Sequence, residues 1–404
     1  MNIAIDCERL ASTFVQLCEI DSPSRREKGV SDFLRQSFGD LGATRIVEDT
    51  SAPRTGSDCG NLIVSIPGNK AGREPIFFAC HMDTVEPGCG VKVLRDGDIF
   101  TSHGDTVLGS DDKSGIAALI ELIRILREDK TEHGPIELVF TTCEEIGLLG
   151  AKALDCTLLT AQFGYALDST GIDRIIIGAP AANKLKIEVH GIAAHAGLHP
   201  EQGISALCLT AKAIADLRMG RLDEDSTSNL GLIYGGVATN IIPDSVTIEG
   251  EVRSHSLQKL AAHTAEIERT FQQVIECWPL PPSLAHAALG HPCPSPRLPD
   301  KGNENEAPAP APSVTITVQL EYPAMHLNLT DPVLARVKQA EMILGRTLEF
   351  QVAGGGSDAN ILNSFGLPTA IIATGMNKVH TTDECLDLRD LTRLTELLYA
   401  IVVA

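Results

Sequence analysis

The sequence predicts an α/β protein in which helices cover a mixed β-sheet and a smaller α+β domain is inserted into the chain. Short apolar segments alternate with amphipathic helical segments up to about residue 180 and again after residue 324. Between these regions the order changes to a β-α-β-β-α pattern, which is typical of a small sandwich. A chain of 404 residues also suits two domains of ordinary size. We therefore expect a larger discontinuous domain, 1–180 and 324–404, and an inserted domain, 181–323.

The discontinuous domain should begin with two helices and continue with buried strands. Apolar residues recur at helical spacing over 7–20 and 27–41. Apolar runs predict strands at 61–66, 75–80, 135–140, 163–167 and 174–177, and a strongly patterned segment predicts a helix over 113–127. After the inserted domain we expect a helix at 331–344, strands at 348–352 and 368–373, and a last helix at 390–402.

The inserted domain should contain four strands and two helices. The strand patterns lie at 184–190, 230–234, 245–252 and 314–322, and the helical patterns lie at 203–217 and 257–277. Residues 279–312 contain ten prolines, and their later part has few hydrophobic residues. Such a segment cannot bury a core, so we predict a mobile loop. A tolerated insertion explains it more readily than a docking segment does.

The composition argues against nucleic acid and membrane partners. With 33 basic and 53 acidic residues, the net charge of −20 repels phosphate backbones and anionic lipid. Eleven cysteines without any C-x-x-C pair indicate free thiols in a reducing compartment. The first residues lack the basic region of a secretory signal, and no apolar run approaches the ~20 residues of a membrane span. We expect a cytoplasmic protein.

Candidate ligands follow several of the predicted strands. His81 and Asp83 follow the strand at 75–80, and residues two apart in extended chain point the same way. Asp83 could therefore hold the ring of a ligand His81, or a neighbouring ligand, in place. Glu144 and Glu145 follow the strand at 135–140. Two adjacent carboxylates in a cavity repel, which leaves one as a ligand and the other as a base with a raised pKa.

Asp111 and Asp112 precede the helix at 113–127. Acidic residues there are favoured by the helix dipole, which is a complete structural explanation by itself. The surrounding L-G-S-D-D-K-S-G turn adds a second interpretation, in which a tight turn presents a carboxylate that bridges two cations.

Asp168 and His380 complete the set, since each follows a predicted strand where an open α/β sheet exposes side chains. Each motif alone has an ordinary explanation. Together they supply two histidines, three carboxylate ligands and one spare glutamate, which suits two zinc ions with a general base beside them.

The order of these motifs resembles that of the dizinc exopeptidases that include aminoacylase and succinyl-diaminopimelate desuccinylase. The order is H-x-D, G-x-D-D-K, E-E-x-G, D, then G-x-x-A-H-A-G at 191–197, and late G-G-G-S-D and H-T-x-x-E motifs. Residues 354–360 and 375–384 are most similar to the peptidase T, or tripeptide aminopeptidase, branch. The resemblance covers nearly the whole chain except 279–312.

The resemblance implies a zinc-exopeptidase-type fold and a ligand set. One zinc would be held by His81 and Asp168 and the other by Glu145 and His380, with Asp111 bridging both. Cobalt or manganese are alternatives, because metal choice also follows availability.

The resemblance also implies roles for two further acids and for one peptide bond. Asp83 would orient the ligands. Glu144 would be the general base for a water activated by the two metals. The peptide bond between Asp111 and Asp112 would be cis.

The inserted domain would act as a lid and dimerisation domain by the same resemblance. His195 would reach the active site of the partner subunit in a homodimer and stabilise the oxyanion. Asn240 and Arg253 would bind a substrate carboxylate, Arg253 through its planar guanidinium. Gly355 and Gly356 would let the backbone approach the substrate.

The function implied is hydrolysis of short peptides, with removal of the first residue of tripeptides. An N-acyl amino acid deacylase or amidohydrolase, or a carboxypeptidase, could use the same metal site. A catalytically inactive binding protein is a further alternative, although no ligand and no base is missing from the motifs.

Overall fold

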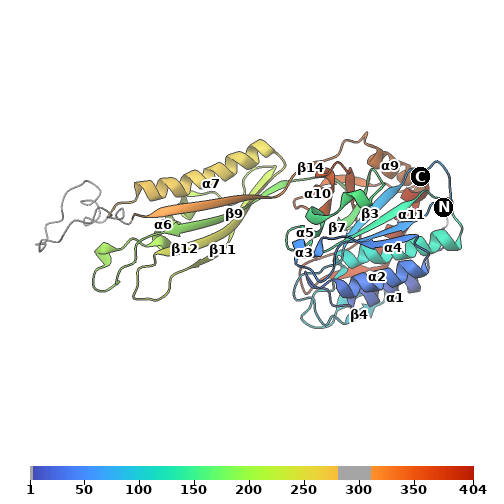
Figure 1. Cartoon of the computed structure of the whole chain (residues 1–404), viewed down its shortest axis with the longest axis horizontal. Coiled ribbons are helices and arrows are strands. Elements are labelled where there is room, and N and C mark those ends of the chain that lie inside the picture. Colours follow the sequence, from blue (N-terminus) through green and yellow to red (C-terminus); the bar gives the residue numbers. More distant parts are fainter. Residues whose placement is uncertain (1–2, 281–310) are drawn as a thin grey trace, which may run out of the picture. The chain divides into compact units, whose positions relative to one another are not determined.

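The computed structural model describes residues 3–280 and 311–404, which form two compact units. Unit 1 comprises Met1–Ala179 and Met325–Ala404, and unit 2 comprises Pro180–Ala324. Most of the proline-rich segment, for which the sequence predicted a mobile loop, lies outside the described residues. The mixed sheet with its covering helices is the predicted α/β fold (Figure 1).

Unit 1 is built on one large mixed sheet. The strands that run through its centre are β6 (Ile136–Thr141), β3 (Ile76–His81), β7 (Gly164–Ser169) and β16 (Thr369–Ala373), and neighbours among them are parallel. Beyond β6 the sheet continues through β2 (Leu62–Ile66) to β1 (Arg45–Glu48). Beyond β16 it continues through β8 (Arg174–Ala179) to β14 (Met325–His326). A further strand, β15 (Glu349–Val352), also pairs with β8.

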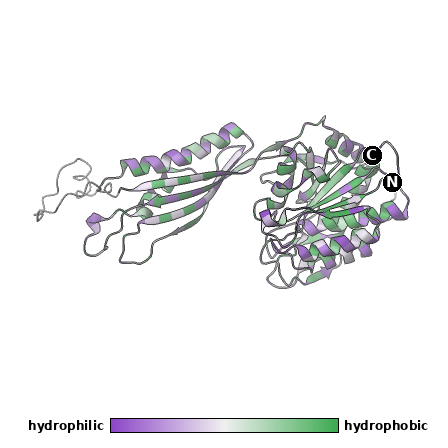
Figure 2. Ribbon diagram, in the orientation of Figure 1, coloured by the Kyte–Doolittle hydropathy of each residue, from purple (hydrophilic) through white to green (hydrophobic). Residues whose placement is uncertain are grey.

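Both faces of this sheet are buried, which explains why its strands appear in the sequence as continuous apolar runs. Phe78 and Phe140 pack in a large core cluster with helices on one face. These helices are α1 (Cys7–Cys18), α2 (Lys28–Asp40), α4 (Ser110–Glu128), α9 (Pro332–Leu344) and α11 (Leu388–Val403). Phe77 and Val139 point to the opposite face, where they pack with Leu362 of α10 (Asp358–Ser364). Figure 2 shows the central strands of this sheet as mainly hydrophobic.

A small antiparallel sheet was not predicted. It joins β4 (Val93–Asp96), β5 (Ile99–Ser102) and β17 (Cys385–Asp387). These strands are short and only partly apolar, so their sequence pattern is weak. The pairing of β17 with β5 fixes the end of the loop that carries His380. Two short helices, α3 (Ala52–Thr55) and α5 (Leu149–Ala153), were also not predicted.

Unit 2 is a five-stranded antiparallel sheet covered by two helices. Its strand order is β10 (Gly220–Arg221), β11 (Ser226–Gly235), β12 (Ser245–Ser254), β9 (Ala181–His190) and β13 (Ser313–Tyr322). Leu185, Ile187 and Val189 alternate along β9 toward a core that includes Leu209 of α6 (Ala206–Asp216) and Phe271 of α7 (Leu257–Cys277). This period of two is what the sequence pattern detected.

Two expectations from composition can be compared with the described residues. The ten cysteines among them are all free thiols. Within the same residues, no helix is both long enough and apolar enough to cross a membrane.

Candidate metal centre

The side chains of the candidate centre gather at one edge of the unit 1 sheet. His81 is the last residue of β3, and Asp168 lies near the end of β7. Glu144 and Glu145 follow β6, and His380 lies in the loop after β16. Because these four strands are parallel neighbours, their carboxyl ends meet at the same edge.

Asp111 lies between the two histidines. Its Oδ1 is 3.0 Å from Nε2 of His81, and its Oδ2 is 3.4 Å from Nε2 of His380. Asp111 lies at the start of α4, where its φ of −86° and ψ of 105° are not helical, and the peptide bond to Asp112 is cis. Regular helix therefore begins near Lys113, as the sequence pattern suggested. The turn before it directs the carboxylate toward the strand ends.

The ligand atoms form two groups that share Asp111. Atoms of His81, Asp111 and Asp168 lie within 4.8 Å of one another, and so do atoms of Asp111, Glu145 and His380. Each group offers one imidazole nitrogen and carboxylate oxygens. That donor set suits zinc and other divalent transition metals, and one shared carboxylate suits a pair of ions. The residues present therefore fit the two metals that the resemblance implies.

Glu144 lies beside these groups and is buried. A third cluster places it with His81 and Glu145 within 4.8 Å. Burial, together with repulsion from Asp168, raises the pKa of Glu144 well above its usual range. Glu144 is next to the candidate metal ligands but belongs to neither of the two groups that share Asp111. With its raised pKa, its carboxylate can therefore accept and release a proton.

Asp83 holds two parts of the site at once. Nδ1 of His81 donates to the backbone carbonyl of Asp83 at 2.9 Å and lies 3.6 Å from its carboxylate. That carboxylate accepts the backbone N–H groups of Glu144 at 2.9 Å and Glu145 at 3.2 Å, and the hydroxyl of Ser24 at 2.6 Å. The sequence suggested only that Asp83 would hold a ring or a neighbouring ligand. Its bonds to the backbone of both glutamates are an additional finding.

Glu27 is a buried acid of this region that the sequence analysis missed. Its carboxylate accepts the backbone N–H of Cys143 at 2.9 Å and a hydrogen bond from the hydroxyl of Ser57. Cys143 has a φ of +54°, which a non-glycine residue adopts only when neighbouring interactions hold it there. No local signal could have indicated this role, because a single glutamate at the start of a helix is ordinary.

His195 and Asn240 lie in adjacent loops of unit 2. The backbone N–H of Ala196 donates to the carbonyl of Asn240 at 2.9 Å. Nδ1 of His195 accepts the backbone N–H groups of Gly197 and Leu198, each at 3.2 Å. The neutral ring therefore carries its proton on Nε2, which leaves an N–H donor at the outer end of an exposed side chain.

The remaining predicted residues have less distinctive surroundings. The guanidinium of Arg253, on β12, forms an ion pair with Glu251 at 2.9 Å. A substrate carboxylate would have to compete with that pair. Gly355 and Gly356 lie in the loop between β15 and α10, just before the N-cap Ser357.

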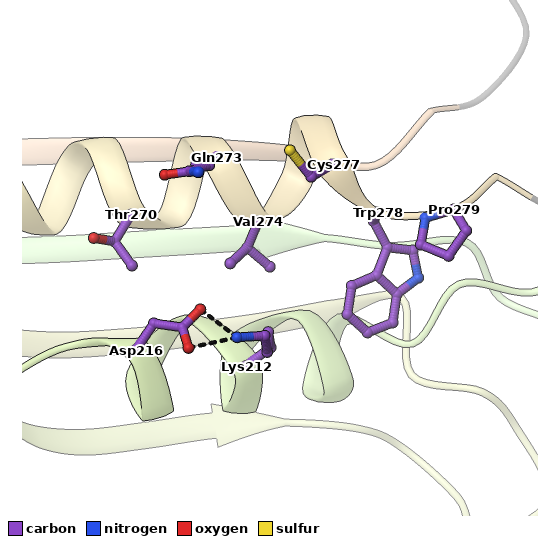
Figure 3. A pocket seen from close by; sticks show the side chains of 8 residues that line it. All are labelled: Lys212, Asp216, Thr270, Gln273, Val274, Cys277, Trp278 and Pro279. Carbon is purple, nitrogen blue, oxygen red and sulfur yellow. Dashed lines mark hydrogen bonds and ion pairs between the residues drawn. The ribbon is translucent and has the colours of Figure 1, made fainter.

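Unit 2 also contains a pocket of about 560 Å³ beside α6 and the C-terminal end of α7 (Figure 3). Val274 and Trp278 give it an apolar side, and an ion pair between Lys212 and Asp216 lies on the other. None of the residues predicted for catalysis or metal binding lines it.

Metal uptake at this centre should release protons. Hydrogen bonds to Asp111 and Glu145 raise the pKa of His380 to about 10. A protonated imidazole has no lone pair for a metal, so below that pH a metal must displace the proton, and the affinity should fall as the pH falls. Calorimetric zinc titration at about pH 7 in two buffers of different ionisation enthalpy should give different heats. Equal heats of zinc binding in the two buffers would contradict this prediction. So would a His380→Ala variant whose heats differ between the buffers by as much as those of the wild type.

Comparisons with known proteins agree with this geometry. Residues 77–404 match the family described as Peptidase family M20/M25/M40. The uncharacterized protein YqjE of Bacillus subtilis is 37% identical over 396 residues, which is 98% of each chain. Aminopeptidase PepT from Bacillus cereus is 37% identical, with a TM-score of 0.82, and the match covers 99% of this chain and 98% of that one.

A tripeptidase from Staphylococcus aureus is 31% identical with a TM-score of 0.85, over 99% of this chain and 98% of that one. Matches to curated peptidase T enzymes are shorter; the one from Escherichia coli K12 is 30% identical over 195 residues, which is 47% of that enzyme. The chain therefore belongs to peptidase family M20/M25/M40 and is a peptidase T-like metallopeptidase.

Proposed function

We propose that this metallopeptidase is an aminopeptidase that removes the first residue of tripeptides with the help of two zinc ions. The observation that carries the proposal is the position of Asp111, whose two carboxylate oxygens face two different imidazoles. Full-length similarity to an aminopeptidase and to a tripeptidase supports the substrate class.

The two ions have separate ligand sets in this proposal. His81 and Asp168 would hold one ion, Glu145 and His380 would hold the other, and Asp111 would contribute to both. When bound, the ions polarise the scissile carbonyl and make a water molecule more acidic. Asp83 fixes the ring of His81 and the backbone of the two glutamates through its hydrogen bonds.

The protein's own groups carry the proton and the developing charge. Glu144 takes a proton from the attacking water and passes it to the departing amine, which its raised pKa favours. His195 donates a hydrogen bond from its Nε2–H group to the carbonyl oxygen as negative charge develops there, and keeps its proton. Asn240 and Arg253 bind the carboxylate end of the peptide.

Unit 2 is the lid and dimerisation domain in this proposal. Along β11, Leu232, Ile233 and Tyr234 are about half exposed, and β10 pairs only with Thr227 and Ser228 at the other end of that strand. Among the described residues, this part of β11 therefore has no strand on its outer side. An exposed apolar edge of this kind suits pairing with a second copy.

The substrate class is tested with a panel of di-, tri- and tetrapeptides, each free, N-acetylated or C-amidated, with products identified by mass spectrometry. We expect release of the first residue from free tripeptides only, because an aminopeptidase recognises the free amine. Cleavage of the N-acetylated members would instead indicate a deacylase. Release of the last residue would indicate a carboxypeptidase.

Glu144→Gln should lower kcat by roughly 10²–10⁴-fold, because the amide cannot accept the proton of the attacking water. Both metals should remain, since Glu144 belongs to neither proposed ligand set. Steady-state kinetics and metal analysis of the same sample check this. A variant that keeps wild-type kcat would show that another group is the base.

His195 should act in the partner subunit's active site, so a solution mass near twice the 43.1 kDa of the chain is expected. His195→Ala and Glu144→Gln should each be inactive alone. After the two are mixed and allowed to exchange subunits, about a quarter of wild-type activity should return, because one site in each mixed dimer has both groups. No recovery despite demonstrated exchange would place His195 in its own subunit's site.

A further inference from the structure

A buried carboxylate, that of Glu384, connects two loops that carry candidate metal ligands. It lies at the end of the His380 loop, and only 2% of the residue is exposed. It accepts the backbone N–H groups of Gly109 and Ser110, each at 2.8 Å, and of Asp111 at 3.2 Å. It also accepts the hydroxyl of Ser110 at 2.5 Å.

The turn around Asp111 depends on these hydrogen bonds. The first N–H groups of a helix have no acceptor within the helix, and here the N-cap, Gly109, has no side chain to supply one. Gly109 has a φ of +75°, and Asp111 is not helical, so successive N–H groups converge on one point. Glu384 occupies that point with a negative charge at the positive end of α4.

The backbone of Glu384 is fixed relative to His380. Its N–H donates to the carbonyl of Thr381 at 3.1 Å. The loop is closed by a pair of backbone hydrogen bonds between Asn377 and Cys385, at 3.0 and 3.1 Å. Cys385 then begins β17, which pairs with β5. Backbone hydrogen bonds therefore hold the main chain of Glu384 in the His380 loop, and the hydrogen bonds that its carboxylate accepts connect it to the Asp111 turn.

We infer that Glu384 is a positioning residue that sets the location of Asp111 relative to His380, and so sets the affinity of the metal position formed by Asp111, Glu145 and His380. This inference rests on the part of the proposed function in which the cluster binds metal. It does not depend on the substrate.

The chemistry of the turn requires a carboxylate of this length. Glutamine would direct an amide N–H₂ group toward N–H donors, so part of the turn would lose its acceptor. Aspartate is one methylene shorter and cannot make the same contacts from the same backbone. By contrast, the neighbouring Asp383 is exposed, and among the described residues its carboxylate makes no hydrogen bond or ion pair with the turn. Asp383→Asn is therefore a matched control.

The test is a two-step zinc titration of metal-stripped protein against a competing chelator. His380→Ala identifies the step that belongs to its metal position. We expect Glu384→Gln to weaken that step by about 10–100-fold, as loss of a residue that orients ligands does, with a smaller change in the other step. Asp383→Asn should titrate like the wild type. Ser110→Ala, which removes one of the four donors, should weaken the same step by a few-fold.

A purely structural role predicts a different result. The thermal midpoint of metal-free Glu384→Gln would then fall while both zinc steps stayed at wild-type affinity, and that outcome would overturn the inference. If Glu384→Gln does not fold, the zinc affinity of Ser110→Ala becomes the test. An affinity equal to that of the wild type would then overturn the inference. A wild-type protein that binds zinc but cleaves no peptide would contradict only the proposed substrate. A wild-type protein that binds no zinc would contradict both.

Discussion

The structure of the site depends on one electrostatic constraint: several carboxylates meet at the buried edge of the sheet. Asp111, Glu144, Glu145 and Asp168 approach one another there. Burial and the neighbouring carboxylates raise the pKa values of Glu144 and Asp168 well above their usual range. Like charges at this separation cannot all remain ionised without positive charge between them. Without metal, protonated His81 and His380 supply part of that charge, because the neighbouring carboxylates raise their pKa values. A pair of divalent ions would take the place of those protons.

A second property of the site follows from where the ligands lie. All of them are on turns or strand ends, whose backbone N–H groups lack partners in a sheet or helix. Three buried carboxylates accept those groups: Asp83 at residues 144 and 145, Glu27 at residue 143, and Glu384 at residues 109 to 111. The same kind of interaction thus fixes two ligand-bearing turns, residues 109–111 and residues 143–145. It explains how loop residues can hold a fixed geometry on a scaffold of parallel strands.

The sequence predicted the parts of this architecture that have strong local signals. The strand Ile136–Thr141 is buried on both faces and appears as an apolar run, and α7 has a clear helical period, so both were predicted at nearly their observed bounds. The sheet of β4, β5 and β17 was missed because its strands are short and partly exposed, so no period is visible. The candidate ligands were recognisable from the order of their motifs. The roles of Glu27 and Glu384 could not be recognised from the sequence, because they depend on contacts between residues more than a hundred positions apart.

The proposed site depends most on the bridging of two metal ions by Asp111, one ion beside His81 and one beside His380. Its most direct test is a crystal structure of the zinc-loaded protein, with anomalous diffraction measured on both sides of the zinc absorption edge. We expect two peaks, one within zinc–oxygen bonding distance of each carboxylate oxygen of Asp111. A single peak, or two peaks of which one has no contact with Asp111, would contradict it.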